Sequence, residues 1–352
     1  MTTHAPVPLW IGTYPHAGIG TPAGLGEGVW RVDLDPATGR LLDGRLVVRT
    51  PAPTFLAADP GGRVLLGVDE SAAGTVTAWD VTADGGLAPR ATVGSGGAHP
   101  CHLLRTPQAL YVANYSDGAL GVLPLAADGG FAPEVLAAGG AVQRFEHAGS
   151  GPVADRQGGP HAHFAALTPD GRHLLVADLG TDELRRYARA ADGSLADAGV
   201  AATLPPGTGP RHLAFSADGT LLHVAGELDA TLHVLAWDAA TATGTARAVL
   251  PAAPGHDGGA PAHVLRDGDR LLMGVRGVDV LTTWPLGPDG TPGTPAVAPL
   301  PGRTPRHHEV VAGWTVVALQ EEHLLVVLDP AGAEVGRLDL PSPACIVPVT
   351  AV

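Results

Sequence analysis

Short apolar runs alternate with polar turns along the whole chain, and the alternation repeats roughly every 45 to 50 residues, a period typical of β-propellers. Each copy contains an apolar strand, a turn, a second strand that ends in a polar turn, and a third strand. Such a meander is too small to bury its own faces, but repetition around an axis protects its edges and leaves a central channel. Five copies place a histidine at the same phase: His102, His163, His212, His263 and His307.

The second residue of each polar turn sets the phase of the repeat: Glu70, Tyr115, Leu179, Glu227, Arg276 and Gln320. Successive positions lie 45, 64, 48, 49 and 44 residues apart, so the long step marks an insertion, residues 140–160, before His161. Six blades follow from this phase, and the apolar runs left at the two ends predict a seventh. Residues 343–349 are expected to form its innermost strand, and residues 9–14, 28–35 and 39–50 the other three.

We therefore predict an all-β fold: a seven-bladed β-propeller, one domain over residues 1–352, with the ring closed by N- and C-terminal strands in one blade. The 49 Gly and 33 Pro suit hairpins between short strands. Cys101 and Cys345 lie far apart in apolar contexts, which favours two buried thiols over a disulfide.

The net charge of the chain limits the classes of molecule that it could bind. A net charge of −14 argues against nucleic acid and against anionic membranes. The chain shows no signal-peptide pattern and no apolar segment of transmembrane length, so we expect a cytoplasmic protein, either a monomer or a weak homo-oligomer.

Two phases of each blade are expected to face one channel mouth: the dipeptide before the inner strand and the turn after the second strand. Together they gather the phased histidines with two glutamates and three arginines: Glu70, Glu227, Arg211, Arg276 and Arg306. A metal site is not expected, because ligands must converge to about 2.0–2.2 Å from one ion, whereas equivalent positions of a ring lie well apart.

The phased histidines have a simpler structural interpretation. His102, His212 and His263 are expected to hydrogen-bond to the backbone or to a neighbouring blade. His163 differs because it follows the insertion, and insertions on a functional rim often carry binding groups.

Each arginine also has a structural interpretation, an inter-blade salt bridge. Arg276 ends an apolar strand, where it needs a carboxylate or an anion, and Glu227 lies sixteen residues after Arg211 in the same blade, so these two should meet. Glu70 occupies the matching turn of another blade and could be a solvated carboxylate. The chain carries no GxSxG nucleophile motif, no phosphate-binding glycine loop before a helix and no calcium-loop spacing.

Residues 151–187, GPVADRQGGPHAHFAALTPDGRHLLVADLGTDELRRY, resemble a signature of the seven-bladed propeller lactonase family. That family includes the bacterial propeller-type 6-phosphogluconolactonase and is similar to the fungal carboxy-muconate lactonizing enzyme. Further similarity covers essentially the whole chain, with RQ…PHAH and GPRHLAF…ELD as its most specific parts. The chain departs from the family at Gly226 and Val275, where asparagine is usual, and at Leu319.

The resemblance implies hydrolysis of a sugar lactone, with 6-phosphogluconolactone as the leading expectation and no cofactor or metal. It places the active site at His163, Arg211, Glu227 and Arg276. His163 is expected to act as general base, the two arginines to hold the oxyanion or a phosphate, and Glu227 to orient them. Further contacts with a small anionic lactone are expected from Arg156, Gln157, His161, Arg306 and Glu70.

Two other functions remain open from the sequence. A muconate-type lactonizing enzyme or cycloisomerase would use the same four residues on a carboxylate substrate. A non-catalytic interaction platform would need a large apolar or aromatic surface, and only 4% of the residues are aromatic.

Overall fold

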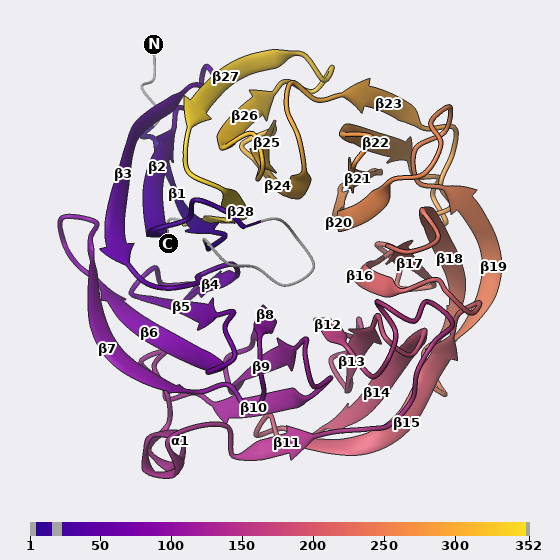
Figure 1. Cartoon of the computed structure of the whole chain (residues 1–352), viewed down its shortest axis with the longest axis horizontal. Helices are drawn as coiled ribbons and strands as arrows, with labels where there is room; N and C mark the ends of the chain where they lie inside the picture. The colour runs from indigo at the N-terminus through magenta and orange to yellow at the C-terminus, as the bar shows by residue number, and fades with distance from the viewer. Residues whose placement is uncertain (1–4, 16–22, 350–352) are drawn as a thin grey trace.

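The computed structural model describes residues 5–15 and 23–349, which form seven four-stranded sheets arranged around a central axis (Figure 1). Neighbouring strands within each sheet are antiparallel. This architecture confirms the predicted seven-bladed all-β propeller. The blades follow one another around the ring in chain order, and in most blades the innermost strand comes first in the sequence.

The first three complete blades contain β4 (Leu56–Ala58), β5 (Val64–Asp69), β6 (Thr75–Val81) and β7 (Leu87–Gly94); β8 (Pro100–Arg105), β9 (Ala109–Asn114), β10 (Leu120–Pro124) and β11 (Gln143–Phe145); and β12 (Ala162–Leu167), β13 (His173–Asp178), β14 (Glu183–Arg189) and β15 (Leu195–Thr203). The next three contain β16 (Pro210–Phe215), β17 (Leu221–Gly226), β18 (Thr231–Asp238) and β19 (Thr243–Pro251); β20 (Ala260–Asp267), β21 (Arg270–Arg276), β22 (Val280–Pro285) and β23 (Ala296–Pro299); and β24 (Pro305–Val311), β25 (Trp314–Leu319), β26 (Leu324–Leu328) and β27 (Glu334–Asp339).

The seventh blade joins strands from both ends of the chain. β28 (Pro343–Pro348) lies innermost and pairs with β1 (Val7–Thr13), followed outward by β2 (Gly28–Leu34) and β3 (Leu41–Arg49). Ile11 pairs with Ile346 across the closing contact. The ring is therefore closed as the sequence predicted, and the closing strands are hydrogen-bonded within one sheet.

The apolar core lies between the blades rather than at one centre. Residues of β17 such as Leu222 and Val224 are fully buried and pack with Leu175 of β13 in the neighbouring blade. Each blade thus buries its faces against its neighbours, with burial worth roughly 25 cal/mol per Å² of apolar surface. Outer strands face solvent, as the mostly exposed β19 shows. Because the sheets support one another, the inner strand ends are held in fixed positions around the channel.

The predicted insertion is only partly a loop. A short helix, α1 (Pro133–Ala138), precedes it and ends at Gly139, whose φ of 70° is left-handed. Residues 143–145 then form β11, the outer strand of their blade, with Phe145 paired to Leu120. The segment after Phe145 crosses back toward the channel. None of the helices in the described part of the chain has the length and apolar character needed to span a membrane.

Candidate active site

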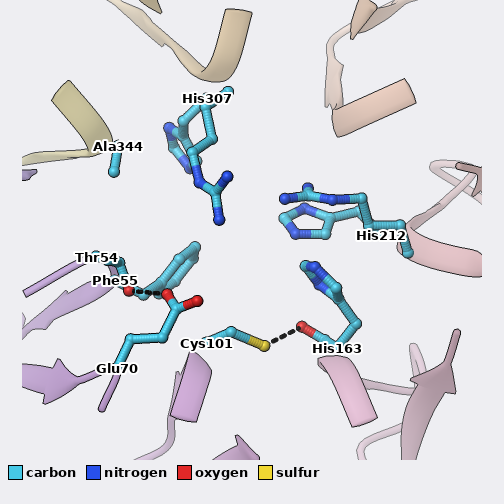
Figure 2. Close-up of a pocket in the computed structure, with 10 residues that line it drawn as sticks. Thr54, Phe55, Glu70, Cys101, His163, His212, His307 and Ala344 are labelled. Atoms are coloured by element: carbon cyan, nitrogen blue, oxygen red, sulfur yellow. Dashed lines mark hydrogen bonds between the residues drawn. The ribbon is translucent and has the colours of Figure 1, made fainter. Parts of the chain in front are cut away.

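A pocket at the channel mouth encloses about 290 Å³ of empty space, part of which is open to solvent (Figure 2). Its lining comes from the inner strands and turns of several blades, and all of the lining residues except Phe55 occupy the two phases singled out in the sequence: Thr54, Phe55, Glu70, Cys101, His163, Arg211, His212, Arg306, His307 and Ala344. Only about 10 Å³ of this space admits the centre of a water-sized molecule, so the side chains nearly fill the pocket. Both cysteines are buried and free, as predicted.

Glu227 is the centre of an arginine cluster beside this pocket. Its Oε2 lies 2.8 Å from Arg211 Nε and 2.8 Å from Arg276 Nη2, and its Oε1 lies 2.7 Å from Arg156 Nη2. The first two contacts are ion pairs rather than aligned hydrogen bonds, since Arg211 Nε and Arg276 Nη2 have no hydrogen-bond partner. Burial alone would raise the pKa of Glu227, but the three guanidinium groups outweigh it and lower that pKa below its usual value. Glu227 is therefore a fixed carboxylate.

The cluster carries more positive than negative charge. Among the described residues, four guanidinium groups, those of Arg156, Arg211, Arg276 and Arg306, face two carboxylates, Glu227 and Glu70, so these side chains carry a charge of at least +2 in a chain of net charge −14. Burial and the neighbouring Arg276 lower the pKa of Arg211 to about 9, which still leaves it protonated at neutral pH. The inter-blade salt bridge considered for Arg276 does exist, but one carboxylate does not balance three arginines. The surplus suits an anionic ligand.

His163 lies in the pocket wall on β12 and is 7% exposed. Its Nδ1 is buried without a hydrogen-bond partner, and its ring meets Tyr115 edge-on at 5.8 Å. Burial and then the charge of Arg211 hold its pKa well below 6.5, so the imidazole is neutral at neutral pH. A neutral imidazole at the pocket wall can accept a proton.

The other phased histidines fill the channel and join blades. Ala165 N donates a hydrogen bond to His102 Nδ1 (3.2 Å) from the next blade. His212 Nδ1 and His263 Nδ1 share a hydrogen bond of 2.8 Å, and His263 stacks on His307 with ring centroids 4.2 Å apart. These contacts match the structural role expected for His102, His212 and His263. The described residues contain no group of three or more His, Cys, Asp or Glu side chains with metal-binding geometry.

The segment after β11 delivers Arg156 to the site. Arg156 Nη2 also donates to Tyr115 Oη (3.3 Å), and His161 stacks on Tyr115 with centroids 4.5 Å apart. His161 Nδ1 lies 2.7 Å from Tyr115 O. In the sequence Tyr115 marks only the phase of the repeat, although it is an aromatic residue in a turn that is expected to face the channel mouth. It is a site neighbour that the sequence reasoning missed.

Gln157 does not line the pocket. It is fully buried, its Nε2 donates to Leu179 O (2.9 Å) and Asp182 Oδ1 (2.7 Å), and its Oε1 accepts from Val153 N (3.2 Å). All of its polar groups are therefore used within the fold. These bonds support an anchoring role for Gln157 in place of the substrate contact expected from the sequence.

Arg306 and Glu70 enter the pocket from different blades. Arg306 Nη1 donates to Gln320 Oε1 (3.2 Å), and its guanidinium lies over the Tyr14 ring, 4.5 Å from the centroid. Glu70 accepts a hydrogen bond from Thr54 Oγ1. Glu70 is partly exposed, but burial raises its pKa, which distinguishes it from a freely solvated turn carboxylate. Burial raises the pKa of the Cys101 thiol, so this thiol is not an activated nucleophile.

Comparison with known proteins shows the family. Residues 8–347 match the model described as "Lactonase, 7-bladed beta-propeller". The chain belongs to this lactonase family. A 6-phosphogluconolactonase of Bacillus subtilis is 27% identical over 355 residues, covering 96% of this chain and 97% of that protein. A Lactococcus lactis protein named uncharacterized protein YwcC is 31% identical over 274 residues, 76% of each chain.

A solved structure that is similar to this chain is named for a different sugar lactone. The periplasmic gluconolactonase PpgL of Pseudomonas aeruginosa is 28% identical, with a TM-score of 0.87 over 99% of this chain and 100% of that one. The relatives of this lactonase-family chain thus bear names for a phosphorylated and for an unphosphorylated sugar lactone. Family membership alone leaves that choice open.

Proposed function

We propose that this chain hydrolyses an anionic sugar lactone, and that its substrate is 6-phosphogluconolactone, giving 6-phosphogluconate. The observation that carries the proposal is the surplus of arginine charge beside neutral His163 at one channel mouth. The name of the Bacillus subtilis relative supports the phosphorylated substrate.

The proposed reaction needs an activated water and a site for the oxyanion. His163 takes a proton from the water as the water oxygen bonds to the lactone carbonyl carbon. Arg211 and Arg306, the two arginines that line the pocket, hold the oxyanion and the anionic group of the substrate. Glu227, whose Oε2 also meets Arg276, fixes the direction of Arg211. No covalent intermediate and no cofactor are part of this scheme.

The remaining arginine extends the site toward the rim. Arg156 is about one-third exposed and paired with Glu227, so it is placed to meet a substrate phosphate at the pocket entrance. A phosphorylated substrate goes together with the proposed cytoplasmic location, whereas the gluconolactonase PpgL is named as periplasmic. The identity of the substrate therefore bears on the proposed reaction and on the proposed cytoplasmic location.

A lactone panel tests the proposal. Glucono-δ-lactone, its 6-phosphate and a muconolactone are compared by acid release at constant pH, with spontaneous hydrolysis subtracted. We expect kcat/KM for the phosphorylated lactone to exceed that for the unphosphorylated one by about tenfold to 150-fold, the worth of one charged hydrogen bond. Equal rates would show that phosphate is not recognised, and preference for the muconolactone would favour the lactonizing alternative. Absence of hydrolysis across the panel would contradict the lactonase function.

A further inference from the structure

Two glutamates at the channel mouth have opposite environments. Glu227 is held by three arginines, which keep it ionised. Glu70 accepts one hydrogen bond from Thr54 and forms no ion pair with the described residues. Two carboxyl groups with environments that push their pKa values apart are the usual arrangement when one group must donate a proton and the other must stay charged.

The environment of Glu70 favours its protonated form. Burial raises its pKa, and the more distant charges of Arg306 and Arg211 only partly oppose this effect. The neutral groups beside it are Thr54 and the Cys101 thiol, whose own pKa is also raised. A bound anion would neutralise Arg306 and Arg211, so the pKa of Glu70 should rise further when substrate binds.

Glu70 and His163 face the same space. Figure 2 shows their side chains entering the pocket from different blades, Glu70 from the turn after β5 and His163 from β12, with Cys101 on the wall between them. A lactone at the open mouth of this space would have a proton acceptor on one side and a protonatable carboxyl group on the other. Before the water attacks, neutral His163 and ionised Glu227 carry no acidic proton for the ring oxygen, and His163 gains one only from that water.

We propose that Glu70 is the general acid that protonates the departing ring oxygen of the lactone, an inference that rests on the proposed lactonase function. His163 accepts the proton of the attacking water, and the water oxygen forms the new bond to the carbonyl carbon. The bond between that carbon and the ring oxygen then breaks, its electron pair stays on the ring oxygen, and Glu70 supplies the proton. The proton on His163 returns to Glu70 through solvent, so one water is added in total.

The test is Glu70→Gln, with Glu309→Gln as the matched control. Glu309 is a partly buried carboxyl on the inner strand β24 whose pKa burial raises to about 7, but it does not line the pocket. On the sugar lactone hydrolysed best by the wild type, we expect Glu70→Gln to lower kcat about 10²–10⁴-fold with little change in KM. The control should keep wild-type kcat and the wild-type pH profile.

The leaving group supplies the second readout. Dihydrocoumarin releases a phenol with a pKa of about 10 rather than an alcohol with a pKa near that of water, about 16, so it needs the acid less. We expect Glu70→Gln to lose less than about tenfold on this aryl lactone, since general acid catalysis contributes most to a poor leaving group. Equal losses on both lactones, or a change in KM alone, would overturn the proposal.

The wild-type pH profile keeps the inference testable if the variant does not fold. Measured below about pH 9, where Arg211 stays protonated, kcat/KM with sugar lactone should fall toward the alkaline side as Glu70 loses its proton, whereas dihydrocoumarin should show no such limb. Absence of that limb with sugar lactone would overturn the role of Glu70 while leaving the lactonase function intact. A wild type that hydrolyses no lactone would instead contradict the function itself.

Discussion

At the residue scale, His163 and His102 look alike in sequence but should respond differently to replacement. His163→Ala should fold normally and lose about 10²–10⁴-fold in kcat, the usual share of general acid–base catalysis. His102→Ala should keep more activity but lose about 1–3 kcal/mol of stability, because Ala165 N loses its buried acceptor. Paired melting and rate measurements separate the two. Full activity in His163→Ala, after subtraction of the uncatalysed rate, would leave arginine electrostatics as the main catalytic effect.

The pH profile should also reflect the environment of His163. A base must be deprotonated, so activity falls as the pH drops through its pKa. Burial and Arg211 hold that pKa well below 6.5, and the acid limb of kcat/KM should therefore lie below the value of an exposed histidine. An acid limb at 6.5 or above would show that another group controls the rate.

Some contacts of the site follow from the repeat, and others do not. The meeting of Arg211 and Glu227 could be predicted because both occupy repeat phases of one blade. The contact of Arg156 with Glu227 could not, because residue 156 lies in an insertion that has no phase. Glu70 was assigned as a substrate contact, but its burial depends on side chains from other blades, and no single repeat reveals that environment.

At the scale of elements, the segment after β11 should act as a support for Arg156. Gln157→Leu removes its hydrogen bonds to Leu179 O and Asp182, so it should cost roughly 1–3 kcal/mol of stability and raise KM for the anionic lactone. Arg156→Gln should raise KM on the order of tenfold, the worth of about 1.4 kcal/mol, without a comparable loss of stability. KM and denaturant unfolding are measured for both variants. An unchanged KM in Arg156→Gln would remove this segment from substrate binding.

The strands were easier to predict than the inserted segment. Apolar runs such as residues 343–349 repeat a pattern and end at turn residues, so their place in the ring could be inferred. β11 has only three residues within the insertion, and its pairing with β10 depends on the return of the chain after α1. A strand this short carries too little periodicity to be recognised from sequence.

At the scale of the whole molecule, the channel is packed with neutral histidines. Six are buried with pKa values held below 6.5, chiefly by burial: His102, His163, His212, His263, His307 and His308. For His102 the pKa falls to about 3, and for His308 to about 4. In the unfolded chain each would titrate near 6.5. The same residues that join the blades therefore make the fold sensitive to acid.

The sign of the effect follows from proton binding. Between about pH 3 and 6.5 the unfolded chain binds protons on these histidines that the folded chain does not, so stability falls as the pH drops. Each such histidine adds about 1.4 kcal/mol of destabilisation per pH unit below 6.5. Glu309 has the opposite effect on the pH dependence of stability, because its pKa is raised to about 7 in the folded state. Glu70, whose pKa is also raised, acts in the same sense as Glu309. Six histidines outweigh these two carboxyl groups.

Urea unfolding at pH 7.5, 6.5, 5.5 and 5.0 tests this balance, in a range where most carboxylates stay ionised in both states. We expect the free energy of unfolding to change little above pH 6.5 and to fall by several kcal/mol between 6.5 and 5.0. His308→Gln, which removes one channel histidine whose folded pKa is about 4, should lower the pH slope by about one proton's worth, 1.4 kcal/mol per unit, whatever its effect at neutral pH. A free energy of unfolding that stays level from pH 7.5 to 5.0 would mean that the folded channel accepts these protons, and the histidines would then not be held neutral by burial.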